Sequence, residues 1–349
     1  MTPRERVVRA INHEWPDKAP KEADFTPTIY TLFREKTGRD DHRGYFGIEM
    51  RGVGFKRSRE INDFSAYLRH LPPGARVTSE YGTADVPGDF YHFTHRVFTL
   101  DEANTVEEVE AYPWPDVTPS YRHDHLEGEV ARLHEQDYFV DAFAGHIFEV
   151  AWQITGFEQM FEKMITNPPF VEAVFDHITA DNCFRARCFA ESGVDMLRTG
   201  DDVGMQDRLM MPVEMWRYYL KPRLGRVIAA ARAVRPGIPV WYHSDGDVSL
   251  IIDDLIDVGV TVLNPVQPEC MDVGVLKDLY SDHLAFWGTV GTQTVMPFGT
   301  PDDVRLAIKG MIDLFAPAIV VAPTHVLEPE VPWENVCAFF EAVEEYGSY

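Results

Sequence analysis

Two histidines and an aspartate lie at or just after the ends of short apolar runs. If these runs are strands, the three side chains lie at the ends of strands of a sheet, where functional residues are often found. His243 ends the run Val240-Trp-Tyr-His, and Asp245 follows two positions later. Side chains two positions apart on an extended chain point the same way, so His243 and Asp245 can act as a pair. A histidine and a carboxylate are half of a common zinc-ligand set. His325 follows another apolar run and could approach the pair from the opposite side of the same end of the sheet. We therefore predict a metal site at His243, Asp245 and His325.

Each of these side chains also has a purely structural interpretation. A histidine at a strand end is often only a hydrogen-bonded packing residue, which is the alternative for His243. His325 could instead bond to the nearby Glu328 or Glu330. An aspartate just before a helix often caps it, and this alternative applies to Asp245 and, more strongly, to Asp247.

Other polar residues follow the neighbouring apolar runs. Asp201 and Asp202 follow one run, and His146 and Glu149 follow another. Gln293 lies in the polar segment after a third run. Adjacent carboxylates in a loop are often only solvated turn residues, so a structural role for Asp201 and Asp202 stays open.

The elements that must position these residues alternate between strand and helix. Six short apolar runs, rich in β-forming residues, are separated by amphipathic stretches at 167–191, 212–233, 249–258 and 300–314. The runs are YFVDAFAG, VDMLRTG, IPVWYH, VTVLN, LAFWGT and AIVVAP. Buried strands between helices indicate a parallel sheet covered on both faces. Six such units, with one early strand after Pro20 and another within 45–55, would close a (β/α)8 (TIM) barrel, although an open doubly wound sheet fits the pattern almost as well.

The N-terminal third has a different character. Thr2 and Glu5 form a capping box for a first helix, with Pro3 in its first turn. Residues 56–118 read as a lid or insertion, with a hairpin at 80–93 that turns at Pro-Gly-Asp and a short capped helix at 105–108. We predict one domain over residues 1–349, with this insertion inside it.

Composition narrows the partners of the protein. The 349 residues include 32 basic and 56 acidic ones, a formal net charge of −24, which disfavours nucleic acid and anionic membranes as partners. The four cysteines show no CxxC spacing, and neither a signal-peptide core nor a membrane-length apolar stretch appears, which favours the cytoplasm. The motifs GxGxxG, GxxxxGK[ST], HExxH and GxSxG are also missing, so nicotinamide, P-loop, zincin and α/β-hydrolase chemistry lose their sequence support.

Several ordered segments carry a resemblance to a known family. They are TPRERVVRAIN with Asp17 and Pro20, the hairpin region with YPWPD, GDDVGMQ, YHSDGD, GVTVLNPVQPE, FWGTVGTQTVMPFGTPDDV and PTHVLEPEVPWENV. Together they resemble the uroporphyrinogen decarboxylase superfamily over nearly the whole chain. The resemblance implies a (β/α)8 barrel with its active site at the carboxyl ends of the strands.

Two departures from the motifs of the superfamily indicate which of its branches this chain resembles. The decarboxylases have an arginine-rich N-terminal segment that grips the substrate carboxylates, whereas residues 23–28 (ADFTPT) contain no arginine. The sister branch comprises corrinoid-dependent methyltransferases, including O-demethylase components, whose zinc ligands resemble His-x-Cys plus a later Cys. Here His243 matches the histidine, Asp245 stands at the first cysteine position, and Thr324 stands near the second, beside His325. Harder oxygen and nitrogen donors suit a methyl ether or alcohol better than a thiol.

The resemblance therefore implies a metal-assisted methyltransferase, of the O-demethylase kind, that moves a methyl group from a small methylated substrate to a separate corrinoid protein. An aryl methyl ether is one such substrate, and the cobalamin-type corrinoid must be on a partner because no DxHxxG-like motif occurs here. Zinc would bind at His243 with Asp245 or His325, and Glu149 or Asp202 would complete the metal shell or protonate the leaving group. The expected substrate-binding residues are His146, Trp152, Asp201, Tyr242, Trp287 and Gln293.

Two other functions remain open from the sequence. One is a metal-free decarboxylase or lyase that uses Asp201 or Asp202 as the acid–base group and His243 for orientation. The other is a non-enzymatic protein that binds a corrinoid or tetrapyrrole. A homodimer is compatible with the sequence in each case.

Overall fold

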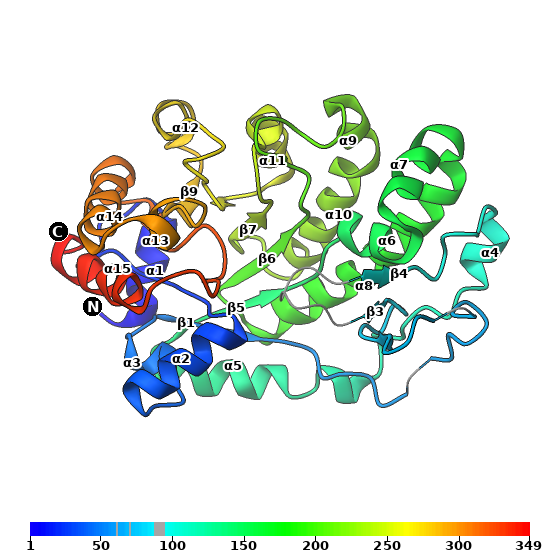
Figure 1. The fold of residues 1–349 in the computed structure, drawn as a ribbon, viewed down its shortest axis with the longest axis horizontal. Coiled ribbons are helices and arrows are strands. Elements are labelled where there is room, and N and C mark those ends of the chain that lie inside the picture. The colour runs from blue at the N-terminus through cyan, green and yellow to red at the C-terminus, as the bar shows by residue number, and fades with distance from the viewer. Residues whose placement is uncertain (61, 70, 87–94) are drawn as a thin grey trace.

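The computed structural model describes residues 1–60, 62–69, 71–86 and 95–349. Its centre is a curled, seven-stranded parallel sheet in the order β1-β5-β6-β7-β8-β9-β10 (Figure 1). The strands are β1 (Met50–Val53), β5 (Phe139–Phe143), β6 (Met196–Gly200), β7 (Val240–His243), β8 (Val262–Asn264), β9 (Ala285–Trp287) and β10 (Ile319–Val320). Each of the six predicted apolar runs contains one of these strands, and so does the predicted segment 45–55.

An eighth segment extends the curl of the sheet. Lys21 forms a parallel bridge with Val321, just after β10, and Glu22 N donates to Val321 O at 3.0 Å. The predicted first strand after Pro20 is therefore present, but only as this short bridge. The strands follow one another around the sheet in chain order, whereas a doubly wound sheet reverses its order at a switch point. The fold is that of a (β/α)8 barrel, and the alternative of an open doubly wound sheet is wrong.

Helices surround the sheet and connect successive strands (Figure 1). The α-helices are α1 (Pro3–Ile11), α2 (Pro27–Thr37), α3 (His42–Tyr45), α4 (Val106–Glu110), α5 (Leu126–His134), α6 (Phe148–Thr155), α7 (Phe157–Thr166), α8 (Pro168–Ser192), α9 (Val213–Tyr219), α10 (Lys221–Arg232), α11 (Ile252–Val258), α12 (Val273–Tyr280), α13 (Val295–Phe298), α14 (Pro301–Phe315) and α15 (Trp333–Tyr346). Two short 3-10 helices, η1 (Ser120–Arg122) and η2 (Ser249–Ile251), complete the set of described helices.

Local sequence signals fix where several helices begin. Thr2 and Glu5 form the predicted capping box at α1, and Thr105 and Glu108 form the predicted one at α4. A third capping box, between Thr300 and Asp303, begins α14. Each box satisfies backbone N–H groups that the first helical turn leaves unpaired.

The inserted segment forms a small antiparallel sheet of β2 (Arg76–Val77), β3 (Ala84–Val86) and β4 (His95–Val97). β3 lies within the predicted hairpin at 80–93, but its antiparallel partner β4 lies beyond the predicted end, and the predicted Pro-Gly-Asp turn lies outside the described residues. Tyr81 connects this segment to α8 because its hydroxyl donates to Asp181 Oδ2 at 2.9 Å.

The contact at Asp181 predicts a pH-dependent stability. Burial raises the pKa of Asp181 to about 6, although the charges of Arg185 and His177 lower it. An aspartate in the unfolded chain ionises near pH 4, so the folded state keeps this proton to a higher pH than the unfolded state does. The free energy of unfolding therefore falls as the pH rises from about 4 to 6. We expect Asp181→Asn, whose amide oxygen still accepts from Tyr81, to raise the free energy of unfolding at pH 7.5 by about 1–3 kcal/mol and at pH 4.5 by about a third as much.

Urea unfolding of the wild type and Asp181→Asn at both pH values measures this effect. Asp282→Asn is the matched control because Asp282 is exposed and its substitution leaves the packing of α8 untouched. A variant that is less stable than the wild type at pH 7.5 would contradict the prediction.

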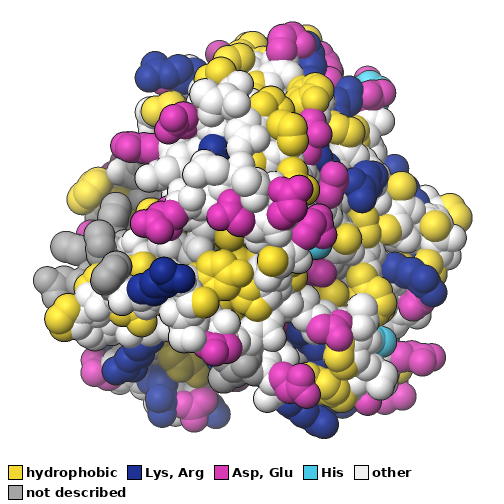
Figure 2. Space-filling model, turned by 90° about the vertical axis from the view of Figure 1, so that its right-hand side faces the viewer, with side chains coloured by type: hydrophobic (Ala, Val, Ile, Leu, Met, Phe, Trp, Pro, Cys, Tyr) yellow, Lys and Arg dark blue, Asp and Glu magenta, His cyan; other side chains and the backbone are white. Residues whose placement is uncertain are grey.

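The surface carries the acidic excess of the sequence. On the face that includes α4 and α7, acidic side chains are scattered among basic and apolar ones, without a continuous basic patch (Figure 2). Among the described residues, no helix combines the length and apolar character that crossing a lipid bilayer requires.

Candidate active site

A cavity of about 370 Å³ opens at the carboxyl ends of the barrel strands. Its lining comes from most strands of the barrel, as expected for a site at this end of the fold. The lining residues are Glu22, Ala23, Asp24, Gly52, Val53, Asp141, Phe143, His146, Arg198, Trp241, His243, Asn264, Trp287, Ala322, Pro323, Thr324, His325 and Val326. Of the predicted site residues, His146, His243, Trp287 and His325 are among them.

His243 is held in one orientation by its neighbours. Its ring stacks on Trp241, with centroids 5.5 Å apart and an interplanar angle of 14°. Asn264 Nδ2 donates to Trp287 O at 3.1 Å, so Asn264 Oδ1 is left as the acceptor for His243 Nδ1 at 2.7 Å. His243 must therefore carry its proton on Nδ1 when neutral, and the lone pair of Nε2 is free for a ligand.

Two carboxylates face this nitrogen. His243 Nε2 lies 3.5 Å from Asp202 Oδ1 and 3.9 Å from Asp245 Oδ1. One ligand atom from each of the three residues lies within 4.8 Å of the others. We call Asp202, His243 and Asp245 the His243 cluster. His325 Nε2 is 4.0 Å from Asp245 Oδ2, on the other side of that carboxylate.

The loop after β7 fixes Asp245 in place. Asp245 N donates to Asp202 Oδ1 at 2.9 Å, which joins the loops that follow β6 and β7. Gly204 allows these loops to approach because a Cβ there would lie 2.4 Å from Asp245 O. Burial raises the pKa of Asp245, while the charge of His243 lowers it. Asp245 Oδ1 is buried without a hydrogen-bond partner.

The composition of the His243 cluster fits a divalent metal ion. It combines a histidine nitrogen in the required tautomer with two carboxylates, and the unsatisfied Asp245 Oδ1 is aimed at that nitrogen. Of the three predicted ligands, His243 and Asp245 lie in the cluster, and His325 lies beside it. Asp202, predicted as a catalytic or shell residue, occupies the third corner.

A second pair lies beside the cavity at the start of α6. His146 Nδ1 donates to Gly200 O at 2.6 Å, and its Nε2 lies 3.3 Å from Glu149 Oε2. Burial lowers the pKa of His146, but the charges of Glu149 and Asp201 outweigh burial and raise it overall. Glu149, predicted to be catalytic, is thus coupled to a histidine that lines the cavity.

Four expected substrate-binding residues lie outside the cavity lining. Asp201 is buried, and its Oδ1 accepts from the backbone N of Ile147 and of Glu149 at 2.8 and 3.0 Å. Burial raises the pKa of Asp201 to about 7. These contacts join Asp201 to the start of α6. Gln293 is exposed in the turn that precedes α13.

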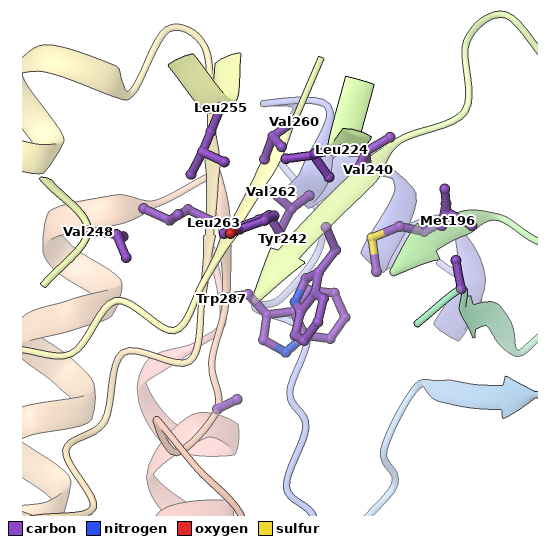
Figure 3. Close-up of a cluster of buried hydrophobic side chains, with 14 of the residues drawn as sticks. Met196, Leu224, Val240, Tyr242, Val248, Leu255, Val260, Val262, Leu263 and Trp287 are labelled. Carbon is purple, nitrogen blue, oxygen red and sulfur yellow. The ribbon is translucent and has the colours of Figure 1, made fainter. Parts of the chain in front are cut away.

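Trp152 and Tyr242, the two aromatic residues expected to bind the substrate, lie outside the cavity lining for different reasons. Trp152 turns to the inserted segment, where the Arg96 guanidinium lies 5.2 Å from its ring. Tyr242 alternates with the inward-facing Trp241 and His243, so it points outward, into the buried cluster that includes Leu224 and Leu255 of the helical layer (Figure 3). Neither ring therefore forms a wall of the cavity.

Sequence reasoning missed the inner end of the cavity. Glu22, Asp141, Arg198 and Trp241 line it, and none of them was among the predicted site residues. A signal existed, because Asp141 and Arg198 interrupt the otherwise apolar strands β5 and β6. A charged residue within a buried strand requires a partner or a function.

Comparisons with known proteins agree with this architecture. The family model described as uroporphyrinogen decarboxylase (URO-D) matches residues 99–346. Among solved structures, the chain is similar to a methyltransferase from Methanosarcina mazei, with a TM-score of 0.66, 16% identity and coverage of 99% of both chains. It is more distantly similar to a B12-independent methionine synthase from Shewanella sp. W3-18-1, with a TM-score of 0.48 and 9% identity over 95% of this chain and 93% of that chain. Among curated proteins, none matches this sequence.

Proposed function

This chain belongs to the uroporphyrinogen decarboxylase family, and from that premise we propose that it is an enzyme that transfers a methyl group from a small methylated substrate to a separate corrinoid protein. The proposal depends chiefly on the His243 cluster at the mouth of the barrel, where two carboxylates face a histidine nitrogen with a free lone pair. The methyltransferase neighbour shares the fold and is compatible with this activity.

The volume of the cavity and the donor set favour a small oxygen-bound methyl donor. The 370 Å³ cavity is at the lower end of the usual range of about 300–1,000 Å³ for small-molecule sites. The His243 cluster offers nitrogen and carboxylate ligands without a thiolate, which suits an ether or alcohol, such as an aryl methyl ether. Trp287 supplies an aromatic surface at the inner end.

The chain's own residues would bind and orient the substrate and manage one proton. A metal ion at His243, Asp245 and Asp202, with His325 adjacent, would supply Lewis acidity to the leaving oxygen. When the carbon–oxygen bond breaks, the methyl group passes to the acceptor and the oxygen keeps the bonding electron pair. The His146–Glu149 pair, of which His146 lines the cavity, would deliver a proton to that oxygen. Docking of the acceptor over the barrel mouth would exclude water from the site.

The two alternatives have weaker support. A metal-free lyase would use Asp201 or Asp202 as its acid–base group, with His243 for orientation. Asp201 accepts two backbone N–H groups at the start of α6. Asp202 lies 3.5 Å from His243 Nε2, so this form of the lyase is separated from the methyltransferase by metal content. A tetrapyrrole-binding role would require a wider site than the 370 Å³ cavity provides.

Metal content together with activity tests the proposal. We expect stoichiometric zinc in the purified wild type and loss of at least about 90% of it in His243→Ala, because removal of a ligand weakens metal binding by more than the roughly 10–100-fold seen for outer-shell residues. His283→Ala is the matched control because His283 is exposed and lies outside the cavity lining. Methyl transfer from a methoxyarene panel to reduced cobalamin should follow the metal content. Methyl transfer by a metal-free wild type, or full activity in a metal-free His243→Ala variant, would refute the metal-assisted mechanism.

A further inference from the structure

Three charged side chains line the inner end of the cavity, and a fourth, Arg43, lies near one of them without being part of the lining. We call Glu22, Arg43, Asp141 and Arg198 the inner cluster. Glu22 Oε1 lies 3.6 Å from both Arg43 Nη1 and Arg198 Nη1, and Arg198 Nη1 lies 3.7 Å from Asp141 Oδ1. These separations exceed the usual range of about 2.7–2.9 Å for a charge-assisted hydrogen bond.

Two atoms of this cluster are buried without hydrogen-bond partners. They are Glu22 Oε1, on a side chain that is 7% exposed, and Arg198 Nε. The other carboxylate oxygen of Glu22 accepts from Trp287 Nε1 at 2.8 Å, which fixes the direction of the free one. A buried polar atom without a partner costs free energy, so both atoms favour a ligand that can satisfy them.

Aromatic rings fix the plane of the Arg198 guanidinium. Its carbon lies 3.9 Å from the centroid of the Trp241 ring, whose neighbour along β7 is the His243 ring. The stack places Arg198 at the level of Trp241, one layer deeper than His243. A ligand that reaches Arg198 therefore spans the cavity, with its other end near the His243 cluster.

The balance of charge in the inner cluster selects the kind of ligand. Two guanidinium groups face two buried carboxyl groups, and Asp24 also bonds to Arg43. Burial raises the pKa of both Glu22 and Asp141, while the charges of Arg198 and Arg43 lower it and favour the ionised forms, in which the two carboxylates balance the two guanidinium groups. A carboxylate on the ligand would approach Arg198 only beside Glu22 and Asp141, and an ammonium would approach Glu22 only beside two arginines. Either charge would meet like charge at low dielectric, which is costly.

We propose that the inner end of the cavity binds an uncharged group that both accepts and donates hydrogen bonds, namely a hydroxyl or a primary carboxamide. The group accepts from Arg198 and donates to Glu22. Its carrier is a small neutral molecule whose opposite end reaches the His243 cluster. Its description as the methyl-transfer substrate rests on the proposed function, whereas the binding preference does not.

Four probes of nearly equal shape test the preference by calorimetry at pH 7.5, without any need for turnover. They are 4-methoxybenzamide, 4-methoxybenzoate, 4-methoxybenzylamine, which is protonated at this pH, and 4-methoxytoluene. We expect the benzamide to bind at least tenfold more tightly than each of the other three. Equal or tighter binding of the benzoate or the benzylamine overturns the proposal, and so does failure of the benzamide to bind.

A matched pair of variants locates the preference. Glu22→Gln removes one negative charge and keeps the size of the side chain, so the ratio of benzamide to benzoate affinity should fall at least fivefold. Glu127→Gln makes the same change at an exposed side chain of α5, outside the cavity lining, and the ratio should change less than twofold. Thermal unfolding verifies that both variants are folded, and equal shifts in the ratio would overturn the assignment to Glu22.

The outcomes separate the two proposals. Preference for the benzamide without any methyl transfer would leave the subsite intact and remove the proposed function. Methyl transfer from a carboxylate-bearing ether, with tight benzoate binding, would support the function and overturn the neutral subsite.

Discussion

Replacing Asp245 with asparagine is expected to lower kcat/KM for methyl transfer by about 1,000-fold, which corresponds to about 4 kcal/mol of transition-state stabilisation. The carboxylate lies 3.9 Å from His243 Nε2 and 4.0 Å from His325 Nε2. Its amide analogue has the same shape but lacks the charge that holds a cation. We expect zinc content, measured by mass spectrometry, to fall in parallel with the rate.

The chain provides a close control two residues away. Asp247 Oδ1 accepts from Ser249 N at 2.9 Å in the turn before η2, whose N-cap is Val248, so the bond is local and is not the helix cap that the sequence suggested. The oxygen of an asparagine side chain accepts in the same way, and Asp247→Asn should retain both zinc and rate within about twofold. A large loss in Asp247→Asn, or normal zinc in Asp245→Asn, would contradict the assignment of Asp245 as a ligand.

The barrel could be predicted because its strands and helices leave local signals. Buried strands such as β7 and β9 read as continuous apolar runs, and α1, α4 and α14 begin at capping boxes. The choice between a barrel and a doubly wound sheet could not be made from these signals. It depends on the order of strands in the sheet and on the bridge between Lys21 and Val321, which joins residues 300 positions apart in the sequence.

The site was predicted where residues lie next to a strand end and missed where the contacts cross the barrel. His243 and Asp245 share one segment, so their proximity follows from strand geometry. Arg198 and Trp241 meet because they are register partners on neighbouring strands, and Glu22 reaches them only because the sheet curls; no local sequence pattern connects the three. Tyr242 was expected to bind the substrate, but alternation along β7 turns its side chain outward, away from the cavity.

Substituting Asn264 is expected to affect metal binding without removing a metal ligand. Asn264 Oδ1 accepts from His243 Nδ1, and this bond keeps the lone pair on Nε2, toward Asp202 and Asp245. In Asn264→Leu the ring loses this acceptor and can adopt the other tautomer or rotate. We expect zinc affinity to fall by about 10–100-fold, the range found for partners of metal-ligating histidines. Competition with a chromogenic chelator measures the change.

Asn264→Asp separates positioning from simple damage to the fold. The aspartate keeps an acceptor at the same place and should retain zinc affinity within about threefold, even though it no longer donates to Trp287 O. In the metal-free protein, ¹⁵N resonances of His243 should report the Nδ1–H tautomer for the wild type and Asn264→Asp, and a mixture for Asn264→Leu. If both variants lost zinc equally while His243 kept its tautomer, Asn264 would be a packing residue only. The difference between the variants thus tests whether this hydrogen bond, and not the volume of the side chain, prepares His243 for its ligand.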